Sequence, residues 1–426
     1  MNKEMQKGEA FISELEQRDI IQNITNRDKV VNALNNNRYL YVGFDPSAES
    51  LHLGNYVVIN VLSLCKKYAI NFIPIIGGIT GQIGDPSGKK AERKLIDVAT
   101  VKHNVECIKK QIAKLLDVDL IVNNLDFYKN STIIDFLRES GKYVNVSYLL
   151  NKEIIKNRLE SGISFTEFSY SILQATDWYH LHHDYNVDVQ MGGSDQWGNI
   201  TIGIDFINKK DEIPEADSPL GGLTLKLLLK SDGTKFGKSE KGAIYLSDKL
   251  VSPYTMYQFL INQTDADSQR LLNYLTDYSV EEIKQIVEKA KEDPAARYAQ
   301  NKLAENIVTR VHGQPVYAKV KNLSSMIFGT NANELTVEDI NLIKHDFPIV
   351  GCAFVDNEKI VDLLTKANIF KSKSELRTLI KQGGLRIGGQ KIADENAVLT
   401  KQNTIDNKYL IVQKGKKDIY ILENVA

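Results

Sequence analysis

The segment 232–240, DGTKFGKSE, contains residue types that bind phosphate in many proteins. It has the glycines and the lysine of the phosphate-loop motif G-x-x-x-x-G-K-[ST], but three residues rather than four separate its two glycines. Lys235 and Lys238 lie on either side of a Phe-Gly step, and Ser239 follows them. Two lysines on a glycine-containing loop could close over the phosphates of a nucleotide, and they could equally belong to an exposed turn.

A second candidate follows the apolar run RYLYV, in the segment YVGFDPSAESLHLGN that ends at Asn55. Pro46 disfavours helix at the preceding residue, and the apolar segment after Gly54 predicts a buried helix. His52 and Asn55 therefore fall near a helix N-terminus at the end of a strand, where backbone N–H groups and the helix dipole attract anions. Both side chains can donate hydrogen bonds to a phosphate or a ribose, although a histidine that caps its own helix would give the same pattern.

Glycines also crowd the segment 77–93, GGITGQIGDPSGKKAER, which follows another apolar run. A glycine-rich backbone can approach a ligand closely, and Lys89, Lys90 and Arg93 add a positive cluster that could contact phosphates. Asp85 lies among the glycines and is expected to be a buried carboxylate. The segment is therefore another candidate for a ligand-binding loop, with a flexible surface turn as the alternative.

Two more segments carry polar side chains in a regular arrangement. In SFTEFSYSILQATD, Tyr170, Gln174 and Asp177 are spaced i, i+4 and i+7, which places them on one face of an otherwise apolar helix. Such a face predicts either a ligand pocket or a satisfied internal network. The segment GGSDQWGN follows a strand pattern; its Ser-Asp pair is expected to cap the next helix, and Gln196 could reach a carboxylate or a sugar.

These segments need a scaffold that brings their ends together. Short apolar runs alternate with helical patterns, and the expected strands are 38–44, 71–76, 119–123, 187–191 and 223–229. This alternation predicts an α/β fold with a parallel sheet and helices on both faces. Ligands bind at the carboxyl ends of such strands. Several glycine-rich strand ends on one sheet therefore predict a nucleotide-phosphate site with a polar pocket beside it.

The length of 426 residues exceeds what one core usually holds, so we expect two or three domains. After the α/β domain, 1–247, helix formers dominate 248–326, and a less regular linker spans 327–357. The last segment, 358–426, has two helical patterns followed by two hairpins, which turn at a Gly-Gly pair and at KGKK. It predicts a small α+β domain of its own.

Composition and charge restrict the function classes. The net charge is -1, but the tail 351–426 has 13 Lys and Arg against 9 Asp and Glu, which favours an anionic partner for the tail. The three cysteines are widely spaced and form no C-x-x-C pair, which argues against disulfides and structural zinc and for a reducing compartment. The sequence has no signal-peptide pattern and no apolar run of membrane-spanning length, so we expect a cytoplasmic protein without a membrane partner.

The motifs together resemble those of class I aminoacyl-tRNA synthetases. HLGN resembles the H-[IL]-G-[HN] signature of that class, and KFGKS resembles its K-M-S-K-S loop. GDPSGKK, SFTEFSY and GGSDQWGN, in that order and spacing, are similar to tyrosyl-tRNA synthetases of the bacterial type in particular. The resemblance extends from residue 38 to a C-terminal segment similar to the S4 RNA-binding fold.

The resemblance implies a Rossmann-like catalytic domain at 1–247, an anticodon-side α-helical domain at 248–326 and an S4-like RNA-binding domain at 358–426. It also implies attachment of L-tyrosine to tRNA(Tyr): ATP and tyrosine form tyrosyl-adenylate and pyrophosphate, and the amino acid then passes to the 3′-terminal adenosine. The substrate carboxylate is the nucleophile, which explains why the sequence shows no protein nucleophile or general base. ATP is a substrate, Mg²⁺ comes with it without a dedicated protein metal site, and a homodimer is expected.

Carried over residue by residue, the resemblance implies three overlapping sets of site residues. The tyrosine pocket would comprise Tyr41, Asp45, Asp85, Tyr170, Gln174, Asp177 and Gln196. The ATP site would comprise Gly43, Asp45, His52, Gly54, Asn55, Gly193, Asp195, Lys235 and Lys238. The catalytic contacts would come from His52, Asn55, Ser47, Lys89, Arg93, Lys235, Lys238 and Ser239. Within these sets, Tyr41 and Asp177 would meet the phenol of tyrosine, and Asp195 the ribose of ATP.

Two departures from the family pattern bear on rates rather than on the reaction. Asn55 replaces a histidine of many relatives, and Phe236-Gly237 replaces Met-Ser, but the polar and cationic ends are kept. Three other functions remain alternatives: an inactive RNA-binding descendant, a tryptophan enzyme of the same fold and a small-molecule nucleotidyltransferase. The retained site residues disfavour the first, the pair Tyr41 and Asp177 disfavours the second, and the S4-like tail disfavours the third.

Overall fold

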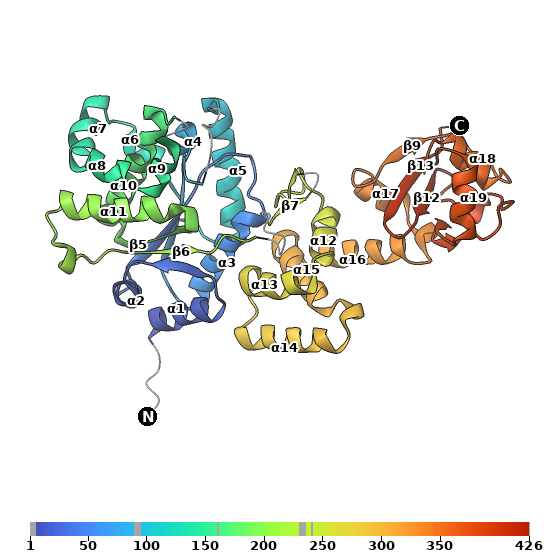
Figure 1. The fold of residues 1–426 in the computed structure, drawn as a ribbon, viewed down its shortest axis with the longest axis horizontal. Helices are drawn as coiled ribbons and strands as arrows, with labels where there is room; N and C mark the ends of the chain where they lie inside the picture. Colours follow the sequence, from blue (N-terminus) through green and yellow to red (C-terminus); the bar gives the residue numbers. More distant parts are fainter. Residues whose placement is uncertain (1–5, 89–94, 160–161, 230–235, 240–241, 426) are drawn as a thin grey trace. The chain divides into compact units, whose positions relative to one another are not determined.

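The chain forms two compact units by its internal contacts. Unit 1 comprises Met1–Leu246 and Thr264–Leu303, and unit 2 comprises Ser247–Gln263 and Ala304–Ala426. The segment 248–326, predicted as one helical domain, is divided between the two units, and the predicted domain boundaries stay a prediction. Of Lys238 and Ser239 only the backbone is described. The computed structural model (Figure 1) describes residues 6–88, 95–159, 162–229, 236–239 and 242–425.

Unit 1 is built on a six-stranded sheet in the order β1-β6-β5-β2-β3-β4. Neighbouring strands are parallel except β1, which pairs antiparallel with β6. The inner strands β2, β3, β5 and β6 are short apolar runs that are largely buried on both faces, as a parallel sheet covered by helices requires. The α/β class predicted from the sequence is thus confirmed. The strands are β1 (Ile21–Ile24), β2 (Tyr39–Phe44), β3 (Phe72–Ile76), β4 (Val122–Asn123), β5 (Val187–Gly193) and β6 (Gly221–Leu225).

Helices cover both faces of this sheet (Figure 1). Adjacent residues of a strand face opposite sides, and a Cβ atom at Gly221 of β6 would meet Val30 of α2, whereas one at Gly222 would meet Ile200 of α11. α2 and α11 therefore pack on opposite faces. The helices of this region are α1 (Lys7–Gln17), α2 (Arg27–Asn35), α3 (Leu53–Lys67), α4 (Thr80–Ile83), α5 (Val98–Leu116), α6 (Leu125–Tyr128), α7 (Ile133–Glu139), α8 (Val146–Leu150), α9 (Glu153–Leu159), α10 (Phe165–Tyr185) and α11 (Trp197–Lys210).

Strand β2 occupies a switch point of the sheet. It lies between β3, which the chain enters next, and β5, which the chain enters later from the other side. At such a point the loops that follow two neighbouring strands turn away from each other and leave a crevice at the carboxyl ends. Asp45 directly follows β2, and Gly193 ends β5. The topology thus brings two of the segments singled out in the sequence to one crevice.

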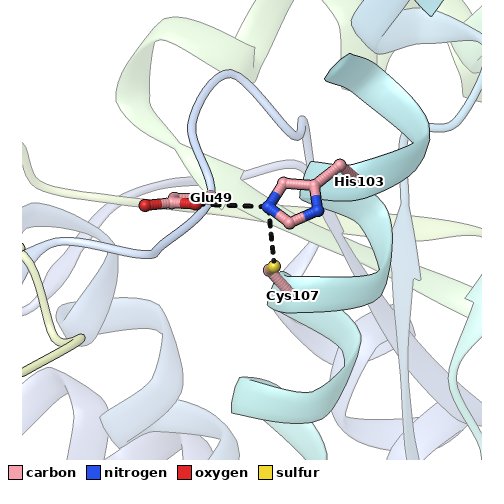
Figure 2. A group of neighbouring side chains, drawn as sticks. All are labelled: Glu49, His103 and Cys107. Carbon is pink, nitrogen blue, oxygen red and sulfur yellow. Dashed lines mark hydrogen bonds and ion pairs between the residues drawn. The ribbon is translucent and has the colours of Figure 1, made fainter. Parts of the chain in front are cut away.

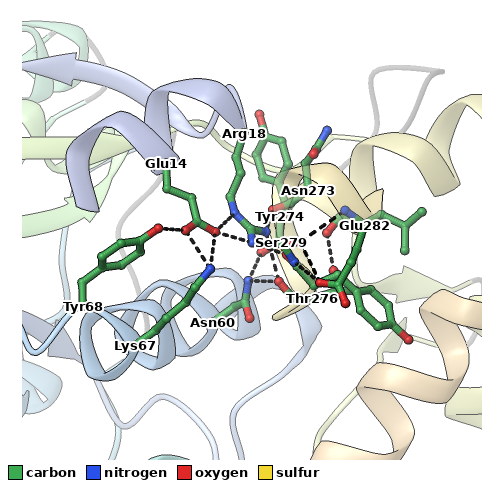
Figure 3. Close-up of polar contacts among 12 residues, drawn as sticks. Glu14, Arg18, Asn60, Lys67, Tyr68, Asn273, Tyr274, Thr276, Ser279 and Glu282 are labelled. Atoms are coloured by element: carbon green, nitrogen blue, oxygen red, sulfur yellow. Dashed lines mark hydrogen bonds and ion pairs between the residues drawn. The ribbon is translucent and has the colours of Figure 1, made fainter. Parts of the chain in front are cut away.

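A buried charge network joins α1 to the C-terminal end of α13 and the chain that follows it (Figure 3). Arg18 has no exposed side-chain surface and donates hydrogen bonds to Glu14 and to the carbonyl oxygens of Asn273, Thr276 and Tyr278. Carbonyl groups at a helix C-terminus lack partners within the helix, and the guanidinium supplies them here. The helices on either side of this segment are α13 (Asp265–Leu275) and α14 (Val280–Glu292).

Helix α3 belongs to the same network. Burial alone would raise the pKa of Glu14, but hydrogen bonds from Tyr68, Lys67 and Arg18 bring that pKa below its ordinary value. Asn60 of α3 donates to the carbonyl oxygen of Tyr274, in the last turn of α13, and to that of Thr276 just after it, each at 3.1 Å. The C-terminal half of α3 is therefore anchored on both α1 and α13, which leaves its N-terminus as the end that can serve the crevice.

Unit 2 contains helices followed by a second sheet in the order β11-β10-β12-β13-β9, antiparallel except for the pair β13 and β9. α18 and α19 pack with this sheet around a core that includes Phe370, Leu376 and Leu410. Its helices are α12 (Pro253–Ile261), α15 (Tyr298–His312, shared with unit 1), α16 (Gln314–Phe328), α17 (Val337–Ile343), α18 (Ile360–Lys366) and α19 (Lys373–Lys381). Its strands are β9 (Ile349–Gly351), β10 (Leu385–Ile387), β11 (Gln390–Lys391), β12 (Tyr409–Lys414) and β13 (Asp418–Glu423).

Both hairpins expected in the tail are present. β10 and β11 turn at the Gly388-Gly389 pair, where both residues have positive φ, and β12 pairs with β13 across the KGKK turn. The sequence did not predict β9 or α17, which lie within the segment 327–357 that was expected to be a linker. Through its pairing with β13, β9 makes part of that segment an edge of the sheet.

Two expectations about the whole chain can be compared with the structure. All three cysteines are free, and Cys65 and Cys352 are buried. The part of the chain that the structure describes holds no helix with both the length and the apolar character that a bilayer crossing needs.

Arg18→Met should lower the stability of the protein strongly. The change removes the hydrogen bonds of the guanidinium to three carbonyl groups and to the buried Glu14 carboxylate, which keeps its bonds from Tyr68 and Lys67. Loss of one partner of a buried ion pair typically costs about 3–5 kcal/mol. Arg27→Met is the matched control, because Arg27 pairs with Glu9 and Glu16 at the surface, where such pairs contribute little. Urea-induced unfolding followed by circular dichroism measures both. Equal losses in the two variants would contradict the role assigned to Arg18.

Candidate active site

A cavity of about 510 Å³ lies at the switch point, at the carboxyl ends of β2 and β5. This volume is within the range of small-molecule sites, about 300–1,000 Å³. The structure brings most of the predicted site residues together around it: Tyr41, Gly43, Asp45, Ser47, His52, Gly54, Asn55, Asp85, Tyr170, Gln174, Asp177, Gly193, Asp195 and Gln196. Lys89, Arg93 and Lys235 lie outside the described residues, and for Lys238 and Ser239 the side chains do.

Asp177 forms one end of the cavity. Its carboxylate accepts hydrogen bonds from the Tyr128 hydroxyl at 2.7 Å and from the Asn124 amide at 2.9 Å. Burial, together with the charge of Asp45, raises the pKa of Asp177 to about 7, although the two hydrogen bonds oppose the shift. The carboxylate can therefore exist in both protonation states near neutral pH, and a ligand that donates to it favours the ionised one.

The Tyr41 hydroxyl lies beside this carboxylate without a hydrogen-bond partner among the described residues. Burial and the nearby Asp177 raise its pKa well above the ordinary value, so the hydroxyl keeps its proton. The Tyr41 ring packs on Trp178, with the ring centroids 5.8 Å apart, which fixes its direction. Buried polar atoms nearly always find a partner, so an unpaired hydroxyl on a cavity wall indicates a place for a polar ligand group.

A second carboxylate, Asp45, is linked to Asp177 through side chains. It accepts from the Tyr170 hydroxyl at 2.9 Å and from Thr80 at 2.8 Å. Asn124 donates to Thr80 at 3.0 Å and also to Asp177. One amide thus links Asp177 to Thr80, which is the hydrogen-bond partner of Asp45. The alternative that the polar face of α10 forms an internal network is thus partly right, and the same network lines the cavity.

One wall carries a chain of amides. Gln174 donates to Gln196 at 3.1 Å, and Gln196 donates to the buried Asp85 at 2.5 Å. The expectation that Ser194 or Asp195 caps α11 was wrong. A turn of 3₁₀-helix occupies Ser194–Gln196 and neither it nor α11 has a side-chain cap, because this turn precedes α11 and Gln196 takes the N-cap position.

The opposite wall is the N-terminus of α3. His52 is the N-cap: its Nδ1 accepts from the backbone N–H of Asn55 at 3.3 Å, and the Asn55 amide oxygen accepts from the N–H of His52 at 3.1 Å. An accepting Nδ1 places the proton of the neutral imidazole on Nε2. The capping alternative is therefore correct, and capping itself leaves each side chain with a donor end, at a helix terminus suited to anions.

Phe236 and Gly237 lie against this helix terminus. The carbonyl of Gly237 accepts from Ile244 at 2.7 Å, and the carbonyl of Ile244 accepts from Leu53 of α3 at 2.9 Å. Gly237 has φ of +83°, and a Cβ atom there would lie 3.0 Å from the backbone nitrogen of Gly54. The glycine that departs from the family pattern is thus required by its backbone conformation and by its close approach to α3. Phe236 beside it is buried.

Sequence reasoning did not identify Thr80, Asn124 or Tyr128. All three act on the carboxylates, and Thr80 and Asn124 also line the cavity. Burial and Asp177 raise the pKa of Tyr128 well above its ordinary value, which keeps it a donor. The only signal in the sequence was position, because Asn124 directly follows the expected strand 119–123 and Thr80 lies in the glycine-rich loop.

Two family models match the chain. Residues 33–329 match the model described as tRNA synthetases class I (W and Y). Residues 339–422 match the model of the tyrosine--tRNA ligase SYY-like C-terminal domain. The two matches lie on either side of residues 330–338.

Curated relatives and solved structures agree with these matches. The tyrosine--tRNA ligase of Mycoplasma mobile is 52% identical over 415 residues, which cover 97% of this chain and 99% of that protein. The tyrosine--tRNA ligase of Ureaplasma urealyticum is 47% identical over 97% of this chain and 98% of that protein. The crystal structure of a C-terminally truncated mitochondrial tyrosyl-tRNA synthetase of Aspergillus nidulans superposes with a TM-score of 0.67 at 28% identity, covering 75% of this chain and 94% of that chain.

The raised pKa of Asp177 predicts a pH dependence of stability. Between about pH 4 and 7 the folded protein holds a proton on this carboxyl that the unfolded chain has lost. The contribution of Asp177 to the free energy of unfolding therefore falls by about 1.4 kcal/mol per pH unit as pH rises. The unfolding midpoint of the parent should therefore decline relative to that of Asp177→Asn from pH 5 to 7, and the difference should be constant above about pH 8. Thermal unfolding at each pH measures this difference.

The exposed Asp248→Asn is the control, and its curve should run parallel to that of the parent throughout. If the Asp177→Asn curve also ran parallel to the parent between pH 5 and 8, Asp177 would have an ordinary pKa and the assignment would be wrong.

Proposed function

The chain belongs to the class I tRNA synthetases of the tryptophan and tyrosine group, within the bacterial tyrosine--tRNA ligases, and we propose that its cavity activates L-tyrosine with ATP for transfer to tRNA(Tyr). The observation that carries the assignment of the cavity is the unpaired Tyr41 hydroxyl beside the Asp177 carboxylate. A phenol can donate to Asp177 and accept from Tyr41 at the same time, whereas the indole N–H of tryptophan can only donate.

The amino acid would lie between the carboxylates of Asp177 and Asp85. Its phenol meets Tyr41 and Asp177, and its α-ammonium group meets Asp85, Tyr170 and Gln174. Asp45 holds the Tyr170 hydroxyl and adds negative charge at the border between the two substrates. Gln196 lies near the substrate carboxylate. Negative charge at this end of a buried site favours an amino acid with a charged α-ammonium group over an analogue that lacks this charge.

ATP would occupy the side formed by the N-terminus of α3. The Nε2–H group of His52 and the NH₂ group of Asn55 donate to the phosphates, and Asp195 contacts the ribose. The backbone at Gly43, Gly54 and Gly193 lies against the nucleotide. Ser47, Lys89, Arg93, Lys235, Lys238 and Ser239 complete the proposed phosphate contacts, as the family resemblance implies.

The chemistry needs no protein nucleophile. A carboxylate oxygen of tyrosine attacks the α-phosphorus of ATP, and the bond to the β-phosphate oxygen breaks to release pyrophosphate. In the second step a ribose hydroxyl of the terminal adenosine attacks the carbonyl carbon of the adenylate and AMP leaves. The protein contributes by holding the reacting atoms in line and by placing donors where charge develops.

Membership of this family also suggests a metal ion, binding partners and a cellular location for the protein. ATP would bring Mg²⁺, held by its phosphate oxygens, because the clusters of potential metal ligands among the described residues do not lie in the cavity. The domain at 358–426 would bind tRNA with its surplus of basic residues, and 248–326 would face the anticodon side. A homodimer that works in the cytoplasm completes the proposal.

Pyrophosphate exchange tests the substrate assignment directly. With ATP present, L-tyrosine should support exchange of labelled pyrophosphate into ATP, and L-tryptophan should not. Phenylalanine should be poorer by a factor of about 10⁴–10⁵, which is the known discrimination of tyrosine enzymes against the amino acid that lacks the hydroxyl. Exchange with tryptophan alone, or with none of the twenty amino acids, would refute the proposal.

His52→Asn separates the catalytic role of His52 from its cap. Asparagine is a good N-cap, so α3 should stay intact while the Nε2–H donor is lost. The rate of pyrophosphate exchange should fall about 10²-fold, the usual cost of one lost transition-state donor, with tyrosine affinity unchanged.

Thr264→Asn, which exchanges one good N-cap for another at α13, is the control and should change neither quantity. Equal losses of tyrosine affinity and of exchange rate in His52→Asn would show that His52 acts through folding rather than on ATP.

A further inference from the structure

Glu49, His103 and Cys107 converge at the surface of unit 1, outside the cavity (Figure 2). The Nε2 atom of His103 lies 3.2 Å from a carboxylate oxygen of Glu49 and 3.5 Å from the Cys107 sulfur. All three potential ligand atoms lie within 4.8 Å of one another. His103 and Cys107 are one turn apart on α5, and Glu49 comes from the loop between β2 and α3.

The geometry fits a tetrahedral ion of the zinc class. With metal–ligand bonds of about 2.0–2.3 Å, tetrahedral ligands lie about 3.3–3.6 Å from each other, close to the two observed separations. Imidazole, thiolate and carboxylate are all ligands of Zn²⁺, and three protein ligands plus one water make a common coordination set. Small side-chain movements would therefore suffice to place an ion among them.

The same contacts argue against a catalytic triad. In a thiol–imidazole–carboxylate triad, the thiol and the carboxylate contact different ring nitrogens, so that the proton can pass through the ring. Here Glu49 and Cys107 both approach Nε2 of His103, as Figure 2 shows. Convergence on one point is the arrangement that metal binding needs.

The helix face that carries this cluster already holds the loop. Asn104 donates to the carbonyl of Pro46 at 3.0 Å, and the Gln111 side chain accepts from the backbone N–H of Leu51 at 2.8 Å. Gln111 also donates to Ser50 at 3.1 Å. The Glu49 cluster lies between these contacts in the chain, and the loop leads directly into the N-cap of α3.

We propose that Glu49, His103 and Cys107 form a binding site for a zinc-class divalent ion that clamps the loop 46–51 onto α5. The ion binds the thiolate, so the thiol proton is released to solvent as the bond forms. Cys107 is the cysteine suited to this role, because Cys65 and Cys352 are buried. The inference depends on local geometry and stands apart from the proposed tyrosine activation.

A Co²⁺ titration of the full chain, after treatment with a chelator and under reducing conditions, tests the site. One Co²⁺ per chain should produce a thiolate-to-cobalt absorption band that Zn²⁺ removes. Cys107→Ser should abolish the band. His103→Gln should keep it but raise the Co²⁺ concentration needed at least about tenfold, since even loss of an indirect partner of a metal costs about 10–100-fold.

His183→Gln is the matched control. His182, His183 and Asp211 form the other cluster of potential ligands among the described residues, and it has no thiol. The band should be unchanged in this variant. Absence of the band at saturating Co²⁺, its survival in Cys107→Ser or its loss in His183→Gln would each overturn the site.

Hydrogen exchange tests the clamp separately. Zn²⁺ should slow amide exchange in 46–51 in the parent and in His183→Gln, and should leave it unchanged in Cys107→Ser. Circular dichroism of Cys107→Ser identical to that of the parent would show that the variant is folded. Unchanged exchange in the parent at saturating Zn²⁺ would overturn the clamp, even where the absorption band is present.

Discussion

The buried carboxylate of Asp177 and the partly buried one of Asp45 line the same cavity, and the structure depends on how Asn124 holds them. The Asn124 amide group donates both to Asp177 and to Thr80, which in turn donates to Asp45, and its oxygen accepts from the backbone of Ile79. Burial is the main reason that the pKa of Asp177 is raised, and repulsion from the charge of Asp45 adds a smaller part. A network of neutral donors keeps both carboxylates in place without cancelling their charge. That uncancelled charge is available to a ligand that carries donors of its own.

The cavity has opposite electrostatic character at its two ends. Burial, Asp45, Asp85 and Asp177 make one end attractive to donors and cations. The N-terminus of α3 makes the other end attractive to anions, through its backbone N–H groups and the donor ends of the His52 and Asn55 side chains. The switch point at β2 creates this polarity, because β2 leads to Asp45 and then within a few residues to the start of α3. One continuous segment thus serves both ends of the site.

Much of this arrangement could be read from the sequence, for identifiable physical reasons. Helix α14 (Val280–Glu292) lies in the segment 248–326, where the sequence predicted helices, because its apolar period is regular and Ser279 caps it. The parallel strands followed from apolar runs, but β6 lies two residues earlier than expected at its start, since Gly221 and Gly222 give no apolar signal. β1 and β9 are short strands with half-exposed residues, and their sheet partners lie far away in the sequence. Pairing of that kind leaves no local pattern.

The site residues divide in the same way. Residues that stand in motifs, such as His52 and Asp177, were predicted and line the cavity, whereas Asn124 and Tyr128 were missed because their importance lies in what they contact. At His52 the local and the functional interpretation were first treated as alternatives; the structure shows the cap, and the cap is compatible with the proposed contact to phosphate. The cap uses Nδ1 and thereby determines the tautomer of the neutral imidazole, so Nε2 carries the proton and is a donor. The same capping contact would therefore prepare the side chain for the anion that we propose it binds. An asparagine at position 55 completes the reciprocal cap through its oxygen and keeps its NH₂ group as a donor, so this departure from the family pattern is compatible with the proposed phosphate contact.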